Sequence, residues 1–273
     1  MSGTGQPVLE ARGVVMRFGG LTALSGFDLT LHSGELVGLI GPNGAGKTTA
    51  FNALTGVYAP TEGDVEVAGR RVNGMRPHQI CELGVARTFQ NVRLFKELSA
   101  FDNVRIACHA GSRSGFTSAW MLTPTHDAEE RRIAARAEEF LSVMELSPRR
   151  DELARNLPYG EQRRLEIARA LATGPRVLCL DEPAAGMNAS EKVALLELIR
   201  RVRDQFQLAI LVIEHDMRLV MGVSERMLVL YHGVTIAQGA PEAVRQDPKV
   251  IEAYLGDGKL RLRPPREAGT GVP

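Results

Sequence analysis

Residues 36–49 of the sequence, LVGLIGPNGAGKTT, decide the fold. The run Leu36–Ile40 is compact and apolar, which is typical of a buried strand. The next nine residues match the pattern GxxxxGK[ST], in which glycines let successive backbone N–H groups point at a phosphate. A helix predicted over Lys47–Thr55 follows, so the motif has the strand before it and the helix after it that it requires. The stretch predicts an α/β fold that binds a nucleotide.

Two side chains of this loop carry its chemistry. Lys47 brings a positive charge to the outer phosphates, and the Thr48 hydroxyl can ligate Mg²⁺. The start of the helix adds a potential that favours an anion. The alternative is a glycine-rich turn with an exposed lysine. The residues of the loop that we expect to bind the phosphates are Gly41, Asn43, Gly44, Gly46, Lys47, Thr48 and Thr49.

Strands and helices alternate again in the last third of the chain. Apolar runs at 176–180 and 208–213 predict buried strands. Between them the pattern predicts a helix over Ala189–Phe206, with Asn188 as its N-cap. Continuous apolar strands that alternate with helices indicate a parallel sheet covered on both faces.

The remaining segments extend this pattern and interrupt it. Residues 8–75 favour mostly short strands, and residues 227–237 favour a hairpin around His232-Gly233. Helices are predicted over 99–109 and 127–146, with a loop insertion at 111–125 between them. This helical block interrupts the alternation and suggests a subdomain.

Polar residues follow several of the predicted strands. Asp181 can hold Mg²⁺ through water, and Glu182 can orient or deprotonate an attacking water. His215 could donate a hydrogen bond to the terminal phosphate, or it could be structural. Gln90 could reach a metal or a water, although most glutamines at a strand end do neither. Cys179 lies within a strand and is best explained as a small buried hydrophobe.

Composition excludes several classes of protein. The 273 residues are 44% hydrophobic and 24% charged, which excludes a disordered, collagen-like or low-complexity chain. A net charge of +1 gives no case for nucleic-acid binding. The 3 widely spaced cysteines form no disulfide framework and indicate a reducing compartment. No apolar run approaches the about 18 residues of a membrane span, and no secretory signal is visible. We expect a cytosolic chain, and any membrane role must come through a partner.

Taken together, these motifs and a further segment at 156–171 resemble the nucleotide-binding subunit of an ABC transporter over roughly residues 8–255. By itself, the segment 156–171 indicates only an amphipathic helix after a turn. The resemblance assigns Walker A to 41–49, Walker B to 177–182, the Q-loop to Gln90, the signature to Leu157–Gln162, the D-loop to Ala185–Asn188 and the switch histidine to His215. It also places Phe18 where an aromatic ring stacks on adenine, with a core phenylalanine as the alternative.

The resemblance implies ATP and Mg²⁺ as cofactors, and two subunits that close head-to-tail around two ATP molecules. Catalysis is then expected from Glu182, His215 and Gln90, and metal binding from Thr48, Gln90 and Asp181. The residues expected to act on the partner's ATP are Pro158, Tyr159, Gly160, Glu161 and Gln162. Two departures from the wider family pattern are Pro158 in place of the signature serine and Asn188 in place of the D-loop aspartate.

The chain is most similar to the ATP-binding subunits of branched-chain amino acid importers. That similarity rests on the variant signature at 157–168, on 181–188, and on the ending at 236–256. It implies a second, non-identical ATP-binding subunit (or a homodimer), two membrane permease subunits and an extracytoplasmic solute-binding protein, with no nucleic acid. The expected location is peripheral, at the cytoplasmic face of the inner membrane.

Other functions stay open at this point. Related systems import urea, short amides or other small solutes. A soluble ABC ATPase of DNA repair or translation usually has a long coiled coil or two cassettes, and a P-loop kinase would lack the signature.

The fold class implied is a P-loop α/β fold with a mostly parallel core sheet, an antiparallel N-terminal β subdomain and an inserted helical subdomain. We expect a single ATPase domain over 8–256, with the helical subdomain at about 95–173. The ends, 1–7 and 257–273, are expected to be flexible.

Overall fold

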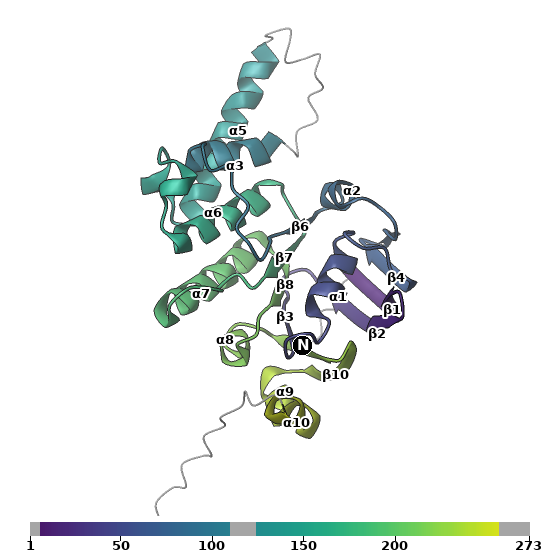
Figure 1. Ribbon diagram of the computed structural model, residues 1–273. Helices are drawn as coiled ribbons and strands as arrows, with labels where there is room; N and C mark the ends of the chain where they lie inside the picture. Colours follow the sequence, from purple (N-terminus) through teal and green to yellow (C-terminus); the bar gives the residue numbers. More distant parts are fainter. Residues whose placement is uncertain (1–5, 110–123, 257–273) are drawn as a thin grey trace, which may run out of the picture.

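The computed structural model describes residues 6–109 and 124–256 (Figure 1). The expected tail at 257–273, most of the expected N-terminal segment and most of the loop expected at 111–125 lie outside the described residues. Within the described part of the chain, none of the helices has the length and apolar character needed to span a bilayer.

A six-stranded sheet carries the centre of the molecule, in the order β10-β9-β3-β8-β7-β6. All neighbouring strands are parallel except the terminal hairpin of β9 and β10, which turns at His232-Gly233. The strands are β3 (Leu36–Ile40), β6 (Val85–Arg87), β7 (Val177–Asp181), β8 (Ala209–Ile213), β9 (Arg226–Tyr231) and β10 (Val234–Gly239). Strands β3, β7 and β8 are buried at every residue, as continuous apolar strands of a covered sheet should be. The predicted mostly parallel sheet is confirmed.

A second, antiparallel sheet has the order β2-β1-β4-β5. Its strands are β1 (Leu9–Phe18), β2 (Leu21–Leu31), β4 (Glu62–Val67) and β5 (Arg70–Arg71). Helix α1 (Lys47–Leu54) follows the phosphate loop, and its buried Phe51 belongs to one apolar cluster with Leu29 of β2 and Leu39 of β3. The cluster joins the two sheets around α1, so the phosphate loop is held from both sides.

Some of the helices lie together in what we call the helical block (Figure 1). Helices α3, α5 and α6 lie together on the side away from β1, β2 and β4, and they share an apolar cluster with α7 and the central sheet. The block consists of α3 (Ala100–His109), α5 (Pro124–Val143) and α6 (Tyr159–Ala172). Outside it lie α2 (Pro77–Glu82) and α7 (Ala189–Phe206). Asn188 and Glu191 form a capping box at the start of α7, as the sequence predicts.

Both ends of helix α5 differ from the prediction. Helix α5 begins at Pro124, where the sequence predicts Asp127, and ends at Val143, where it predicts Leu146. Pro124 and Thr125 are therefore helical, not loop. Proline is favoured in the first turn of a helix because the N–H that it lacks has no partner there.

Three short helices lie in the last described part of the chain, up to residue 256: α8 (Met217–Met221), α9 (Pro241–Gln246) and α10 (Pro248–Gly256). Tyr254 of α10 is buried in a cluster with Ile40, the last residue of β3. Burial raises the pKa of its hydroxyl, while the backbone of Gly41 acts in the opposite direction. The last helix therefore packs beneath the start of the phosphate loop.

Candidate nucleotide-binding site

The phosphate loop requires its glycines. Gly46 has φ +101° at the start of α1, and a Cβ there would lie 2.7 Å from the carbonyl oxygen of Ala23. A Cβ on Gly41 would lie 2.2 Å from the carbonyl oxygen of Leu230. Gly44 has φ +79°, and a Cβ there would meet nothing within 4 Å. The loop is thus packed tightly on the sheet at its base and open at its tip, where a ligand approaches.

A cavity of about 400 Å³ opens above this loop. It is lined by Leu21, Thr22, Ala23, Gly44, Ala45, Gly46, Lys47, Thr48, Thr49, His232 and Gly233. The Lys47 ammonium is buried and donates to the carbonyl oxygens of Gly41 and Pro42 at 2.7 and 2.8 Å. Thr48 is exposed at the start of α1. The cavity, the lysine charge and the helix N-terminus together fit a phosphate chain.

The carboxylates lie at the ends of β7 and β8. Asp181 is buried, and burial raises the pKa of its carboxyl, while the charges of Arg87 and Lys47 favour the ionised form. Glu182 has φ +44°, a conformation that is uncommon for a residue other than glycine, and its N–H donates to the carbonyl oxygen of Ile213 at 2.9 Å. His215 Nδ1 lies 3.7 Å from Glu182 Oε2. The structure therefore brings Asp181, Glu182 and His215 together.

Glu214 is a residue of this group that the sequence analysis missed. It is 1% exposed, and its Oε1 accepts a hydrogen bond from the Ala184 N–H at 3.1 Å. Burial raises the pKa of Glu214. His215 Nδ1 lies 3.7 Å from Glu214 as well, so the imidazole faces two carboxylates. The position of Glu214 directly before His215 was the available signal.

The structure offers few protein ligands for the expected Mg²⁺. Within the described ranges, no three His, Cys, Asp or Glu side chains are grouped so that they could hold a metal ion. Mg²⁺ usually takes one or two protein oxygens and completes its shell with water and phosphate oxygens. The Thr48 hydroxyl and the Asp181 carboxylate are oxygen donors of this kind, so they fit a cation that arrives with a nucleotide.

The signature residues lie apart from the phosphate loop. Pro158 is the N-cap of α6, and Tyr159 and Gly160 form its first turn. Pro158 and Tyr159 are exposed. The Gln162 side chain donates to the carbonyl oxygen of Leu157 at 2.8 Å, and Glu161 lies 3.4 Å from Arg149. Among the described residues that line the 400 Å³ cavity, none comes from this segment.

Two further predicted residues lie at the surface. Phe18 is 43% exposed and packs edge-on against Tyr58, with ring centroids 5.2 Å apart, so the alternative of a core phenylalanine is wrong. Gln90 is exposed in the segment after β6, and its carbonyl oxygen accepts a hydrogen bond from Arg163. Neither residue lines the cavity above the phosphate loop.

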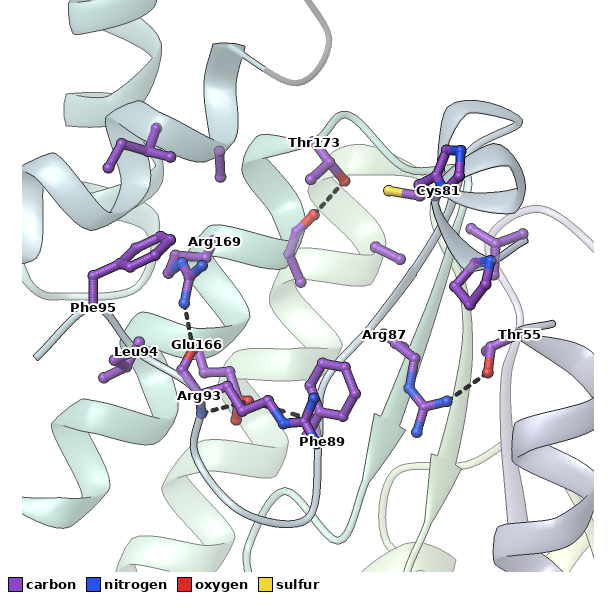
Figure 2. A pocket seen from close by; sticks show the side chains of 17 residues that line it. Thr55, Cys81, Arg87, Phe89, Arg93, Leu94, Phe95, Glu166, Arg169 and Thr173 are labelled. Atoms are coloured by element: carbon purple, nitrogen blue, oxygen red, sulfur yellow. Dashed lines mark hydrogen bonds between the residues drawn. The ribbon is translucent and has the colours of Figure 1, made fainter. Parts of the chain in front are cut away.

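A second cavity of about 790 Å³ lies between the segment after β6, helix α2 and the helical block (Figure 2). Three arginines line it, each over an aromatic ring. Arg87 and Arg93 lie 4.7 and 3.9 Å from the centre of the Phe89 ring, and Arg169 lies 4.7 Å from that of Phe95. Burial lowers the pKa of both Arg87 and Arg169. The Nε atoms of Arg87 and Arg169 are buried and have no hydrogen-bond partner within the described chain.

Comparison with known proteins agrees with this geometry. Residues 24–185 match the ABC transporter family, and residues 234–259 match a family described as branched-chain amino acid ATP-binding cassette transporter. The chain is 46% identical over 252 residues to the high-affinity branched-chain amino acid transport ATP-binding protein BraF of Pseudomonas aeruginosa. It is also 46% identical over 252 residues to the corresponding protein LivG of Escherichia coli. Each match covers 92% of this chain and 99% of the relative.

A solved structure, the ADP conformation of an ATP-binding cassette of an ABC transporter, superposes with a TM-score of 0.80 at 29% identity. The match covers 92% of this chain and 100% of that one. The chain belongs to the ABC transporter family. It has the P-loop fold of the ABC ATPases, and it is an ATP hydrolase of that type.

Proposed function

We propose that this chain powers an importer of branched-chain amino acids by binding and hydrolysing ATP on behalf of membrane permease subunits. The observation that carries the proposal is the 46% identity, over nearly the full length, to two transport ATP-binding proteins with that cargo. The match of residues 234–259 to a branched-chain amino acid cassette family supports it. Urea, short amides or another small solute are the alternative cargoes.

The residues of the site have distinct roles in this proposal. The N–H groups of the phosphate loop and Lys47 hold the phosphates. Thr48 and Asp181, with Gln90, would hold Mg²⁺, and the cation would neutralise negative charge on the phosphates. The Phe18 ring, exposed near the surface, is available to stack on adenine. Glu182 orients and deprotonates the attacking water. His215, 3.7 Å from that carboxylate, is placed to donate to the terminal phosphate.

A second ATP-binding subunit completes each site. The exposed Pro158 and Tyr159 and the start of α6 lie away from the cavity above the phosphate loop of the same chain. A helix N-terminus with free N–H groups favours an anion, so it can act on the ATP held by a partner subunit. Head-to-tail closure of two subunits around ATP would therefore couple binding to a conformational change.

We propose that the 790 Å³ cavity is the binding site for a segment of the permease. The Nε–H groups of Arg87 and Arg169 are buried and have no partner within the described chain, and the two guanidinium groups lie over the rings of Phe89 and Phe95. A short helix with an apolar face and one carboxylate would satisfy both features. The chain would then lie peripherally on the cytoplasmic face of the inner membrane, with cargo delivered by an extracytoplasmic binding protein.

Reconstitution tests this proposal. The chain is combined with its second ATPase and its permease subunits in vesicles, and ATPase activity is measured with leucine-loaded, urea-loaded and empty binding protein. We expect low activity from the dilute isolated chain and stimulation by leucine-loaded binding protein. Full activity of the monomer would contradict a site completed by a second subunit. Stimulation only by urea-loaded binding protein would mean that urea, and not a branched-chain amino acid, is the cargo. A Glu182→Gln complex controls for contaminating ATPases.

A further inference from the structure

The chain leaves the central sheet between Thr88 and Phe89, at the start of the segment 89–93, which carries Gln90. Up to Thr88 the chain is bonded to the sheet: the Thr88 N–H donates to the carbonyl oxygen of Cys179 at 2.9 Å, and its hydroxyl accepts from the Asp181 N–H at 3.3 Å. From Phe89 to Arg93, the backbone is instead hydrogen-bonded by side chains of helix α6. The segment therefore belongs mechanically to the helical block.

Two buried side chains make most of these bonds. Arg163 donates to the carbonyl oxygens of Phe89, at 2.8 Å, and of Gln90. Glu166 Oε1 accepts from the N–H groups of Phe89 and Arg93 at 3.4 and 3.2 Å. Arg169 adds a bond to the carbonyl oxygen of Arg93. Figure 2 shows Glu166 beside the backbone between Phe89 and Arg93.

The buried charges of Arg163 and Glu166 are paired with each other. Arg163 is 2% and Glu166 5% exposed, and Arg163 lies 3.2 Å from the second carboxylate oxygen of Glu166. Burial raises the pKa of Glu166, while Arg163 and the two backbone N–H groups favour the carboxylate. Both carboxylate oxygens are thus used, which is the condition under which a buried ion pair holds one geometry.

The same arginine reaches the signature. Arg163 Nε donates to the Tyr159 hydroxyl at 3.1 Å. A Cβ on Gly186 would lie only 3.1 Å from the Tyr159 ring, so this ring in turn packs on the segment 185–188. One side chain therefore connects the backbone of Gln90 to the first turn of α6.

We propose that Arg163 and Glu166 clamp the segment 89–93 onto helix α6, so that Gln90 and the signature turn 158–160 shift as one body, hinged between Thr88 and Phe89. This inference rests on the proposed function, and it makes Arg163 and Glu166 positioning residues for hydrolysis. A partner seated in the 790 Å³ cavity, which Phe89, Arg93 and Glu166 line, would move both parts at once.

Hydrogen exchange on the isolated chain tests the clamp itself. In the wild-type chain, the amides of Phe89 and Arg93 should be as protected as those within α6, and fast exchange at both would refute the clamp without any variant. In Glu166→Gln and Arg163→Lys, these two amides should exchange at least about tenfold faster while α6 stays protected. The control is Arg164→Lys, because Arg164 lies on the same helix but pairs outward with Glu145.

Kinetics of the reconstituted complex test the positioning role. The two clamp variants should bind ATP with an affinity within about twofold of wild type, because the phosphate loop is untouched, and lose about tenfold or more in cargo-stimulated kcat. Arg164→Lys should behave as wild type. Unchanged stimulation in folded clamp variants would overturn the inference. If the wild-type complex shows no stimulation, the proposed function fails, and the exchange experiment still decides the clamp.

Discussion

Replacing Gly160 by alanine should stabilise the isolated chain and at the same time slow hydrolysis by the assembled transporter. Gly160 is the second residue of helix α6, and it is not among the glycines with positive φ. A Cβ at this position would meet only the Met187 methyl group, at 3.7 Å, an ordinary van der Waals distance. The fold therefore makes no demand for glycine here.

The two effects have opposite signs. Alanine is favoured over glycine in a helix by about 0.5–1 kcal/mol, and a domain of this size gains roughly 2–4 °C in Tm for each kcal/mol. The expected change in Tm is therefore about 1–4 °C upward. Backbone donors at a reacting oxyanion are each worth about 10²–10³ in rate, so a Cβ that keeps the partner's phosphate away should lower kcat by at least about tenfold.

Thermal unfolding of the isolated chain and ATPase of the reconstituted complex measure these two effects separately. Gly160→Asp should also fold, because an acidic residue suits a helix N-terminus, and it should abolish hydrolysis by repelling phosphate. Pro158→Ser should be tolerated. Gly222→Ala, at the end of α8 with a Cβ contact of 3.5 Å, is the control glycine. If a folded Gly160→Asp complex hydrolysed ATP at the normal rate, the turn 158–160 would not be part of the catalytic site.

Three further experiments, two with substitutions and one with cysteine labelling, have definite expected outcomes. Lys47→Ala should weaken ATP binding, whereas Glu182→Gln should keep binding and slow turnover about 10²–10⁴-fold, as nucleotide titration and single-turnover kinetics will show. Cys81 is partly exposed in the lining of the 790 Å³ cavity, so iodoacetamide should label it in the native chain and bound permease should block the labelling. The labelling should be slow, because burial raises the pKa of this thiol. Cys179, whose pKa burial raises to about 12, should stay unlabelled, and native labelling of it would contradict the fold. Glu214→Gln should raise Tm at neutral pH, because burial raises the folded-state pKa of Glu214. The protonated Glu214 stabilises the fold below about pH 4.3, and this stabilisation is lost as pH rises through the folded-state pKa. Glutamine stays neutral at every pH, so it avoids the cost of a buried charge. The gain in Tm should shrink below about pH 4, and a lower Tm than the parent at pH 7 would contradict this reasoning.

The phosphate loop could be predicted from sequence because its physics is local. A strand, a glycine turn and a helix start occupy consecutive residues, and the structure confirms that β3 and α1 flank residues 41–46. The hairpin of β9 and β10 and the capping box of α7 were predictable for the same reason. Each depends on residues at most a few positions apart.

The clamp could not be predicted in this way. Arg163 and Glu166 are an oppositely charged pair three residues apart on a helix, a pattern typical of a solvated helix face. Their burial is caused by the segment 89–93, more than 70 residues earlier in the chain. Glu214 is a similar case, because its partner, the Ala184 N–H, lies 30 residues away. The signature was equally invisible to local reasoning and was assigned by family resemblance.

The arrangement divides the proposed catalytic residues between two bodies. The register of β7 and β8 pairs Asp181 with Ile213, and the Glu182 N–H donates to the Ile213 carbonyl, so the backbone of Glu182 is held by the sheet. The positive φ of Glu182 costs about 1–3 kcal/mol, which this bond and the burial of β7 offset. Gln90 is instead bonded to the helical block. The 790 Å³ cavity is lined from both bodies, by Arg87 on the side of the sheet and by Phe89 and Glu166 on the side of the helical block. A partner that binds there would shift Gln90 and the signature relative to Glu182, whose backbone the sheet holds.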